Sequence, residues 1–178
     1  MVEAVVGPFA RSPLSGRSDD LGALGAVEVR FPTQLNLRAG PATAGRLALE
    51  LPTVPNTWLA GGGREALWLG PNEWLLVAGP GVAGELVAEL ERALDGQHHS
   101  VVDVSADRAV FDLAGEDRVD LLAKGCGLDL HPRSWRDGMC AQTLLARVPV
   151  LLQERERATR LFVRASFAGH LVSWLSQA

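Results

Sequence analysis

The sequence has few of the features that define disulfide-rich, membrane-spanning or nucleic-acid-binding proteins. It holds two cysteines and a single lysine in 178 residues, and its formal net charge is −4. Two cysteines do not make a disulfide scaffold. An acidic balance gives no reason to expect nucleic-acid binding, which favours a basic surface. No apolar run approaches the about 20 residues that span a bilayer, so we expect no membrane partner.

The N-terminal region also lacks a recognisable export signal. Met1–Arg11 has no basic segment followed by a clean apolar stretch, so no signal peptide is predicted and the cytoplasm is the default location. Residues 1–22 are rich in Pro, Gly and Ser and show no sustained period. We therefore expect a flexible N-terminal tail over these residues.

Motifs of common hydrolytic enzymes are missing: neither G-x-S-x-G nor H-E-x-x-H occurs. Cys126, His131 and Cys140 are three potential zinc ligands, but structural zinc usually takes four ligands with two of them in a close C-x2-4-C pair. A disulfide between the two cysteines fits their spacing but not a reducing cytosol. A nucleophilic cysteine would need a base and an orienting group, which the spacing does not supply. Packing roles are predicted for both cysteines.

Apolar residues make up 47% of the chain, enough for a real core, and they alternate with polar residues in the first half. The period of two over Val27–Leu37 predicts a half-buried strand with Pro32 at an edge or a break. Leu47–Leu51 repeats the pattern, and Pro52–Gly63 is predicted to be loop. Two apolar runs, 67–69 and 74–78, flank Gly-Pro-Asn-Glu and predict an antiparallel hairpin.

The second half of the chain mixes helical and strand periods. The expected elements are a helix over Gly84–Leu94 ended by Gly96, strands over Val101–Val104 and Arg108–Leu113 joined by a tight turn, a helix over Glu116–Lys124, a long strand over Thr143–Gln153, a charged turn over Glu154–Thr159, a strand over Arg160–Arg164 and a last helix from Ser166. Strands followed by a helix occur twice. This order predicts an α+β fold of two small lobes, 23–97 and 98–178, each made of antiparallel strands with packed helices.

The segment Gly79–Gly84 reads G-x-G-x-x-G between a strand and a helix, which is the fingerprint of dinucleotide-binding loops. Asp103 follows at about the distance of a ribose-binding acid. Against this reading, the preceding strand is predicted to belong to an antiparallel hairpin, and Pro80 removes an N–H from a loop that should cradle phosphate. A structural strand-to-helix turn is the favoured interpretation.

Lys124–Thr143 is the stretch around which the rest of the chain is organised, because it gathers the only lysine, both cysteines, a histidine and a tryptophan in a turn-rich link. Gly125 is predicted to end the preceding helix in the left-handed conformation. Lys124 then lies in the last helical turn, where a cation complements the helix dipole. Asp137-Gly138 is predicted to be a turn that leads into the next strand.

Five short stretches of the chain carry a resemblance to a known family. They are Lys124-Gly125-Cys126, Leu128-Asp129-Leu130-His131-Pro132, Cys140-Ala141-Gln142-Thr143, Gly70-Pro71-Asn72-Glu73-Trp74 and Arg164-Ala165-Ser166-Phe167. In combination they resemble the gamma subunit of heterotetrameric sarcosine oxidase, over residues 25–178. The resemblance implies a fold similar to that of folate-binding aminomethyltransferases such as the glycine-cleavage T protein.

The same resemblance implies an accessory subunit that has no catalytic residue, cofactor or metal of its own. Its implied partners are the alpha, beta and delta subunits, which hold the FAD, FMN, NAD, tetrahydrofolate and zinc of the complex. The implied activity of that complex is the oxidative demethylation of sarcosine to glycine, with O2 and tetrahydrofolate giving hydrogen peroxide and 5,10-methylenetetrahydrofolate. Two alternatives stay open. One is a stand-alone folate-binding protein of one-carbon transfer, although the chain is about half the expected length; the other is a dinucleotide-binding module that uses Gly79–Gly84.

Family-motif and interface candidates follow from the resemblance and from residue type. Trp135, Arg133 and Arg136 belong to the residue types enriched at binding hot spots, so the link is predicted to present them to the alpha subunit. The alternative is that Trp135 covers the edge of the core while the arginines are solvated. The complete set of candidates is Trp74, Lys124, Cys126, His131, Arg133, Trp135, Arg136, Cys140, Gln142 and Thr143.

Overall fold

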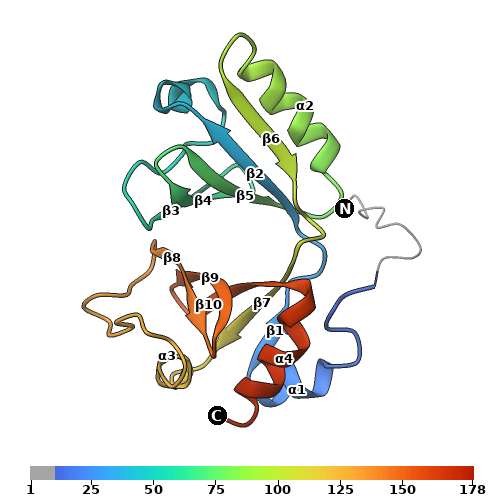
Figure 1. The fold of residues 1–178 in the computed structure, drawn as a ribbon, viewed down its shortest axis with the longest axis vertical. Helices are drawn as coiled ribbons and strands as arrows, with labels where there is room; N and C mark the ends of the chain where they lie inside the picture. The colour runs from blue at the N-terminus through green and yellow to red at the C-terminus, as the bar shows by residue number, and fades with distance from the viewer. Residues whose placement is uncertain (1–10) are drawn as a thin grey trace. The chain divides into compact units, whose positions relative to one another are not determined.

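The computed structural model describes residues 11–178, which fold into two compact units. Unit 1 contains Phe31–Ser105, and unit 2 contains Arg11–Arg30 together with Ala106–Ala178. Each unit has one five-stranded sheet in which every pair of neighbouring strands is antiparallel (Figure 1). The predicted α+β class, with antiparallel strands and packed helices in two lobes, is confirmed.

Unit 1 is a sheet with one long helix on one face. Its strand order is β3 (Trp58–Gly61), β4 (Arg64–Gly70), β5 (Glu73–Ala78), β2 (Thr33–Ala39) and β6 (His99–Asp103), with a 3-10 helix η1 (Pro41–Arg46) and the helix α2 (Ala83–Ala93). The helix α2 lies on one face of this sheet (Figure 1). Its buried residues Leu86 and Leu90 pack in one core with apolar residues of β2 and β5, such as Leu37 and Leu76. The i, i+4 spacing of these leucines is what made this helix predictable.

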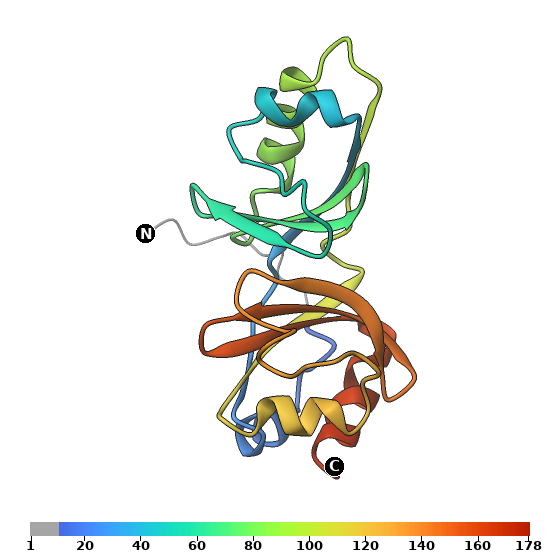
Figure 2. The same ribbon diagram turned by 90° about the vertical axis from the view of Figure 1, so that its left-hand side faces the viewer.

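Unit 2 buries one face of its sheet under three helices. The strand order is β1 (Ala26–Glu28), β7 (Arg108–Ala114), β10 (Ala158–Arg164), β9 (Val148–Arg155) and β8 (Cys140–Leu145), and the helices are α1 (Ser18–Ala23), α3 (Arg118–Ala123) and α4 (Ala165–Leu175). Leu21, Leu122 and Leu171, one from each helix, pack in the same core with Phe111 and Leu161 of the sheet. Figure 2 shows α3 and α4 on the same side of this sheet. No helix within residues 11–178 is long and apolar enough to cross a membrane.

The predicted lobe boundaries need correction at both ends of unit 1. The strand β6 pairs with β2 and belongs to unit 1, although it falls after residue 97. The strand β1 pairs with β7 and belongs to unit 2. Residues 11–22 of the predicted tail are also part of unit 2, because Leu14 and Leu21 are buried in its core. Residues 1–10 of that tail lie outside the described residues.

Two predicted strands prove to be pairs of shorter strands. The alternating run 27–37 breaks at Phe31, which has φ +50°, so that β1 and β2 enter different sheets. The break lies beside Pro32, as the sequence predicted. The apolar run 143–153 is a hairpin of β8 and β9, whose turn residues Ala146 and Arg147 have φ +50° and +67°. Neither residue is typical of such a turn.

Three further expectations about local structure are wrong. The strands β6 and β7 belong to different sheets and do not form a hairpin. The run Leu47–Leu51 forms no strand, although Leu49 and Leu51 are buried in the unit 1 core. The predicted loop over 52–63 contains β3. For β6 a chain-distant neighbour decided the structure, because alternation alone does not specify the partner of a strand. The strand β3 instead forms a local hairpin with β4 across Gly62 and Gly63.

Candidate functional site

The link between α3 and β8 is held by a buried glutamate at the end of β9. The Glu154 side chain accepts hydrogen bonds from Trp135 Nε1 at 2.8 Å, from the Arg118 guanidinium at 2.7 Å and from the Thr159 hydroxyl. The Glu154 backbone N–H donates to the Met139 carbonyl at 2.8 Å. Glu154 is 4% exposed, so the sequence-based assignment of this residue to a charged surface turn is wrong. We call these five residues the Glu154 clamp.

The clamp places Trp135 in the core of unit 2. Its side chain is 6% exposed and packs with the apolar residues of the helices and the sheet. The structure therefore supports the alternative expectation, in which Trp135 is part of the core, and it removes the indole from the surface of this chain. Arg133 and Arg136, the other two interface candidates, are exposed.

His131 lies in a tight local turn rather than near either cysteine. Asp129 accepts a hydrogen bond from the Ser134 hydroxyl at 2.7 Å and from the His131 backbone N–H at 3.1 Å, and these two bonds lower the pKa of its carboxyl group, the first more than the second. His131 Nδ1 accepts the Arg133 backbone N–H at 3.2 Å. The polar groups of this turn thus serve mainly to shape it.

The three potential zinc ligands, which the sequence analysis did not favour as a metal site, lie in different environments. Cys140 is fully buried on β8, Cys126 is half-buried with its Sγ 3.8 Å from the Thr143 hydroxyl, and His131 is exposed. Both cysteines have free thiols. Among residues 11–178 no three His, Cys, Asp or Glu side chains are placed to hold a metal ion. Gln142, the next candidate on β8, is exposed.

Lys124 and Gly125 end α3, but glycine is required there for another reason than the one predicted. Gly125 is absent from the positions with positive φ. A Cβ at Gly125 would lie 2.6 Å from Trp174 Cη2 and 3.1 Å from the Ala146 nitrogen. The Ala146 N–H donates to the Gly125 carbonyl at 3.0 Å, which fastens the β8–β9 turn to the end of α3. The Lys124 ammonium donates to the main-chain oxygen of Ala178.

The Gly79–Gly84 loop is a strand-to-helix turn in an antiparallel environment. It follows β5, whose two neighbours β2 and β4 are both antiparallel to it. Gly81 has φ +79°, while a Cβ at Gly79 or Gly84 would meet no atom within 4 Å. Only one of the three glycines is therefore needed for backbone conformation. The strands β5 and β6 run parallel, but β2 lies between them, so the sheet is not that of a dinucleotide-binding fold.

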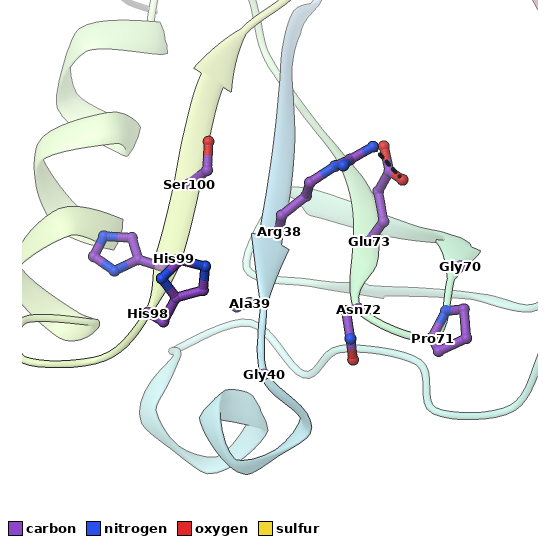
Figure 3. Close-up of a pocket in the computed structure, with 10 residues that line it drawn as sticks. All are labelled: Arg38, Ala39, Gly40, Gly70, Pro71, Asn72, Glu73, His98, His99 and Ser100. Atoms are coloured by element: carbon purple, nitrogen blue, oxygen red, sulfur yellow. Dashed lines mark hydrogen bonds and ion pairs between the residues drawn. The ribbon is translucent and has the colours of Figure 1, made fainter.

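Unit 1 has a hollow of about 590 Å³ at one end of its sheet, formed by the end of β2, the β4–β5 turn and the start of β6. We call it the β2–β6 hollow. Its lining residues are Arg38, Ala39, Gly40, Gly70, Pro71, Asn72, Glu73, His98, His99 and Ser100 (Figure 3). Four of them, Gly70 to Glu73, are part of the motif that ends in Trp74. Trp74 itself is buried and donates from Nε1 to the Pro52 carbonyl at 2.8 Å.

The two histidines of the hollow have different surroundings. Figure 3 shows the His99 ring turned toward α2 and the His98 ring turned toward β2. His99 bonds the Gln97 carbonyl through Nδ1 and Glu91 through Nε2, both at 2.9 Å. The Gln97 carbonyl, and then Glu91, raise the pKa of His99. No contiguous sequence motif indicates the hollow, because three segments that are distant in the chain form it.

Sarcosine oxidase gamma subunits are similar to this chain in sequence. The profile of the sarcosine oxidase, gamma subunit family matches residues 38–178. Sarcosine oxidase subunit gamma from Arthrobacter sp. is 41% identical over 167 residues, which is 88% of this chain and 80% of that protein. The same subunit from Corynebacterium sp. strain P-1 is 39% identical over 166 residues, with the same two coverages.

Solved structures agree with the sequence relatives. A chain of the heterotetrameric sarcosine oxidase from Corynebacterium sp. U-96, in complex with pyrrole 2-carboxylate, superposes with a TM-score of 0.86 and 35% identity over 95% of this chain and 94% of that chain. The glycine cleavage system aminomethyltransferase T from Bartonella henselae shares the fold, with a TM-score of 0.63 and 15% identity over 88% of this chain and 47% of that chain. The resemblance carried by the five short stretches is confirmed, and so is the related fold. The chain belongs to the sarcosine oxidase gamma subunit family.

Proposed function

We propose that this chain is the accessory gamma subunit of a heterotetrameric sarcosine oxidase. The observation that supports this most strongly is the match to a chain of the Corynebacterium sp. U-96 enzyme, which extends over 94% of that chain at 35% identity. A match of this length and identity supports the same role in assembly for this chain. The partners are then alpha, beta and delta subunits.

The assembled enzyme would convert sarcosine, O2 and tetrahydrofolate to glycine, hydrogen peroxide and 5,10-methylenetetrahydrofolate. The FAD, FMN, NAD, tetrahydrofolate and zinc of that reaction would be held by the other subunits. The contribution of this chain is structural. Within residues 11–178 the most buried acid is Glu154, which Trp135 and Arg118 engage in holding the link. Cys140 is buried in β8.

Co-expression with the three partner subunits tests the proposal. A tag on this chain should retain all three partners through size-exclusion chromatography, and the retained complex should produce peroxide from sarcosine. The purified chain alone should produce none. Failure to retain any partner, or peroxide production by the chain alone at the rate of the complex, would contradict the proposal.

The alternative of a folate-binding protein has one observation in its favour, the fold shared with aminomethyltransferase T. That likeness covers 47% of the transferase chain and concerns the fold alone. Calorimetric titration of the purified chain with tetrahydrofolate separates the two functions. A stand-alone carrier should bind at micromolar concentrations, whereas an accessory subunit should show no saturable heat.

A further inference from the structure

The β2–β6 hollow is built so that three strands contribute polar side chains to one face of the sheet. Arg38 on β2 lies opposite Glu73 on β5 and opposite Ser100 on β6 in the strand register. Side chains of directly opposed residues share a face and lie about 5 Å apart at Cβ. The hollow's volume of about 590 Å³ falls within the range of small-molecule sites, about 300–1,000 Å³.

The carboxylate of the hollow is already neutralised. One Glu73 oxygen accepts the Asn36 side-chain amide at 2.8 Å, and the other accepts the Arg38 guanidinium at 3.0 Å. The Arg38 side chain remains 66% exposed. A guanidinium has five N–H groups in a planar fork, so a single bond to Glu73 leaves most of its donors open to a second acceptor.

Three more polar side chains in the hollow have no internal partner. Within residues 11–178, the Asn72 amide, the His98 ring and the Ser100 hydroxyl make no hydrogen bond or ion pair. All three residues are exposed. His99, in contrast, uses both ring nitrogens on Gln97 and Glu91. The hollow therefore has hydrogen-bond donors without partners, while the Glu73 carboxylate is already bonded to Asn36 and Arg38.

We propose that the β2–β6 hollow binds a small aliphatic carboxylate, with Arg38 as the principal anchor. The carboxylate accepts the open N–H groups of Arg38, and Asn72, His98 and Ser100 donate to its oxygens or to a neighbouring polar group of the ligand. The exposed ring of Pro71 contacts the aliphatic part. This site goes beyond the accessory role and does not depend on it.

One carboxylate suits the charge of the hollow better than a phosphate does. Arg38 already shares its positive charge with Glu73, so every charge on a bound anion adds to an excess of negative charge at the site. A carboxylate adds one negative charge, whereas a phosphate dianion adds two. The planar fork of Arg38 can pair bidentately with either group, so the charge of the ligand is what separates them.

Butyrate, butyramide and inorganic phosphate are the probes, and two-dimensional amide NMR of the full chain is the measurement. Butyrate should cause saturable shifts at Asn72 and Ser100 with a dissociation constant in the millimolar range. Butyramide has the same shape without the charge and should bind at least about tenfold more weakly, because a charge-assisted bond contributes more than about 1.5 kcal/mol. Phosphate should bind more weakly than butyrate.

Arg38→Gln should weaken butyrate binding at least about tenfold, and His98→Ala should weaken it by a smaller factor. Arg92→Gln is the matched control, since Arg92 is an exposed arginine on α2 outside the hollow, and it should leave binding unchanged. The proposal is overturned by the absence of saturable shifts, by equal binding of butyramide, by tighter binding of phosphate, or by unchanged affinity in Arg38→Gln. Retention of the partner subunits is measured separately, so failure of the ligand site and failure of the accessory role can be told apart.

Discussion

The Glu154 clamp of unit 2 and the β2–β6 hollow of unit 1 contain similar polar side chains and arrange them in opposite ways. In the clamp, the Glu154 carboxylate accepts hydrogen bonds from an arginine and from an indole N–H, and both Glu154 and Trp135 are 6% exposed or less. In the hollow, Asn72, His98 and Ser100 are exposed and make no internal bond within the described chain. The hollow includes Gly70–Glu73 of the stretches that resemble the family, whereas the five clamp residues lie outside those stretches. Residue type therefore does not separate a group that holds the fold from one available to a ligand; burial and partners do.

The energetic basis of this difference lies in the cost of losing a partner. A buried donor or charge that is left without its partner costs the free energy of its desolvation. An exposed group that loses its partner forms hydrogen bonds with water instead, so the cost is small. Substitutions in the clamp should therefore lower the free energy of unfolding, and substitutions in the hollow should leave it nearly unchanged.

Trp135→Ala should lower the free energy of unfolding by about 3–5 kcal/mol, because it leaves a cavity in the unit 2 core and removes a donor to Glu154. Urea unfolding of the free chain measures the loss. Phe167→Ala is the control, since Phe167 is 42% exposed and should lose far less. An unchanged free energy together with weaker retention of partner subunits would instead make Trp135 an interface anchor.

Glu154→Gln keeps the shape of the side chain and removes its charge, which leaves the half-buried Arg118 without its anionic partner. We expect a loss of about 2–3 kcal/mol in the free energy of unfolding. Glu156→Gln, at an exposed position in the following turn, should change it by less than about 0.5 kcal/mol. Equal effects of the two substitutions in urea unfolding would show that the clamp adds nothing to stability.

Gly125→Ala places a Cβ 2.6 Å from Trp174 and should cost about 1–3 kcal/mol through overpacking. Gly127→Ala is a matched control two residues away, because a Cβ there meets no atom within 4 Å. Adding Trp174→Phe should recover part of the loss, while the contact with the Ala146 nitrogen remains. Thermal unfolding of the three variants checks the order, and a Gly125→Ala variant as stable as Gly127→Ala would refute the close-packing argument.

Gly81→Ala should cost about 1 kcal/mol, because its φ of +79° disfavours a residue with a Cβ. Gly84→Ala, within α2, should instead stabilise the chain by up to about 1 kcal/mol through helix propensity. Calorimetric titration with NAD should show no heat of binding for the parent chain. A micromolar dissociation constant that Gly81→Ala abolishes would support the dinucleotide-binding alternative.

The smallest effect concerns the pH dependence of unit 1. Because its hydrogen bonds raise the pKa of His99 above the usual value of 6.5, protonated His99 stabilises the folded state. This contribution is fully present below about pH 6.5 and is lost as the pH rises through the higher folded pKa. Urea unfolding from pH 5 to 9 should therefore show a fall that His99→Gln removes. His98→Gln is the control and should retain the fall; a parent profile identical to that of His99→Gln would contradict the prediction.

Local elements with a strong period could be predicted from the sequence alone. The β4–β5 hairpin around Pro71, the helices α2 and α3 and the end of α2 at Gly96 all follow from residues close together in the chain. The family could also be predicted, because its short motifs are contiguous. These predictions succeeded where the interactions that decide the structure lie within a few turns of helix or one hairpin.

The β8–β9 hairpin could not be predicted in the same way. Its turn residues, Ala146 and Arg147, carry no signal for positive φ, and the apolar run across them reads as one strand. The hydrogen bond from Ala146 to Gly125 helps to hold the turn. Glycine at position 125 was predicted to adopt a left-handed conformation. It is required there instead because the atoms nearest to a Cβ would belong to Trp174, almost 50 residues away in the chain.

The sequence by itself determined which residues are apolar, where most local elements lie and to which family the chain belongs. Tertiary structure decided which sheet each strand joins, that Glu154 and Trp135 are buried together, and that Arg38, Asn72 and His98 surround one hollow. Alternation along a strand assigns side chains to a face. It does not specify the neighbouring strand, because that choice depends on the packing of segments that are distant in the chain.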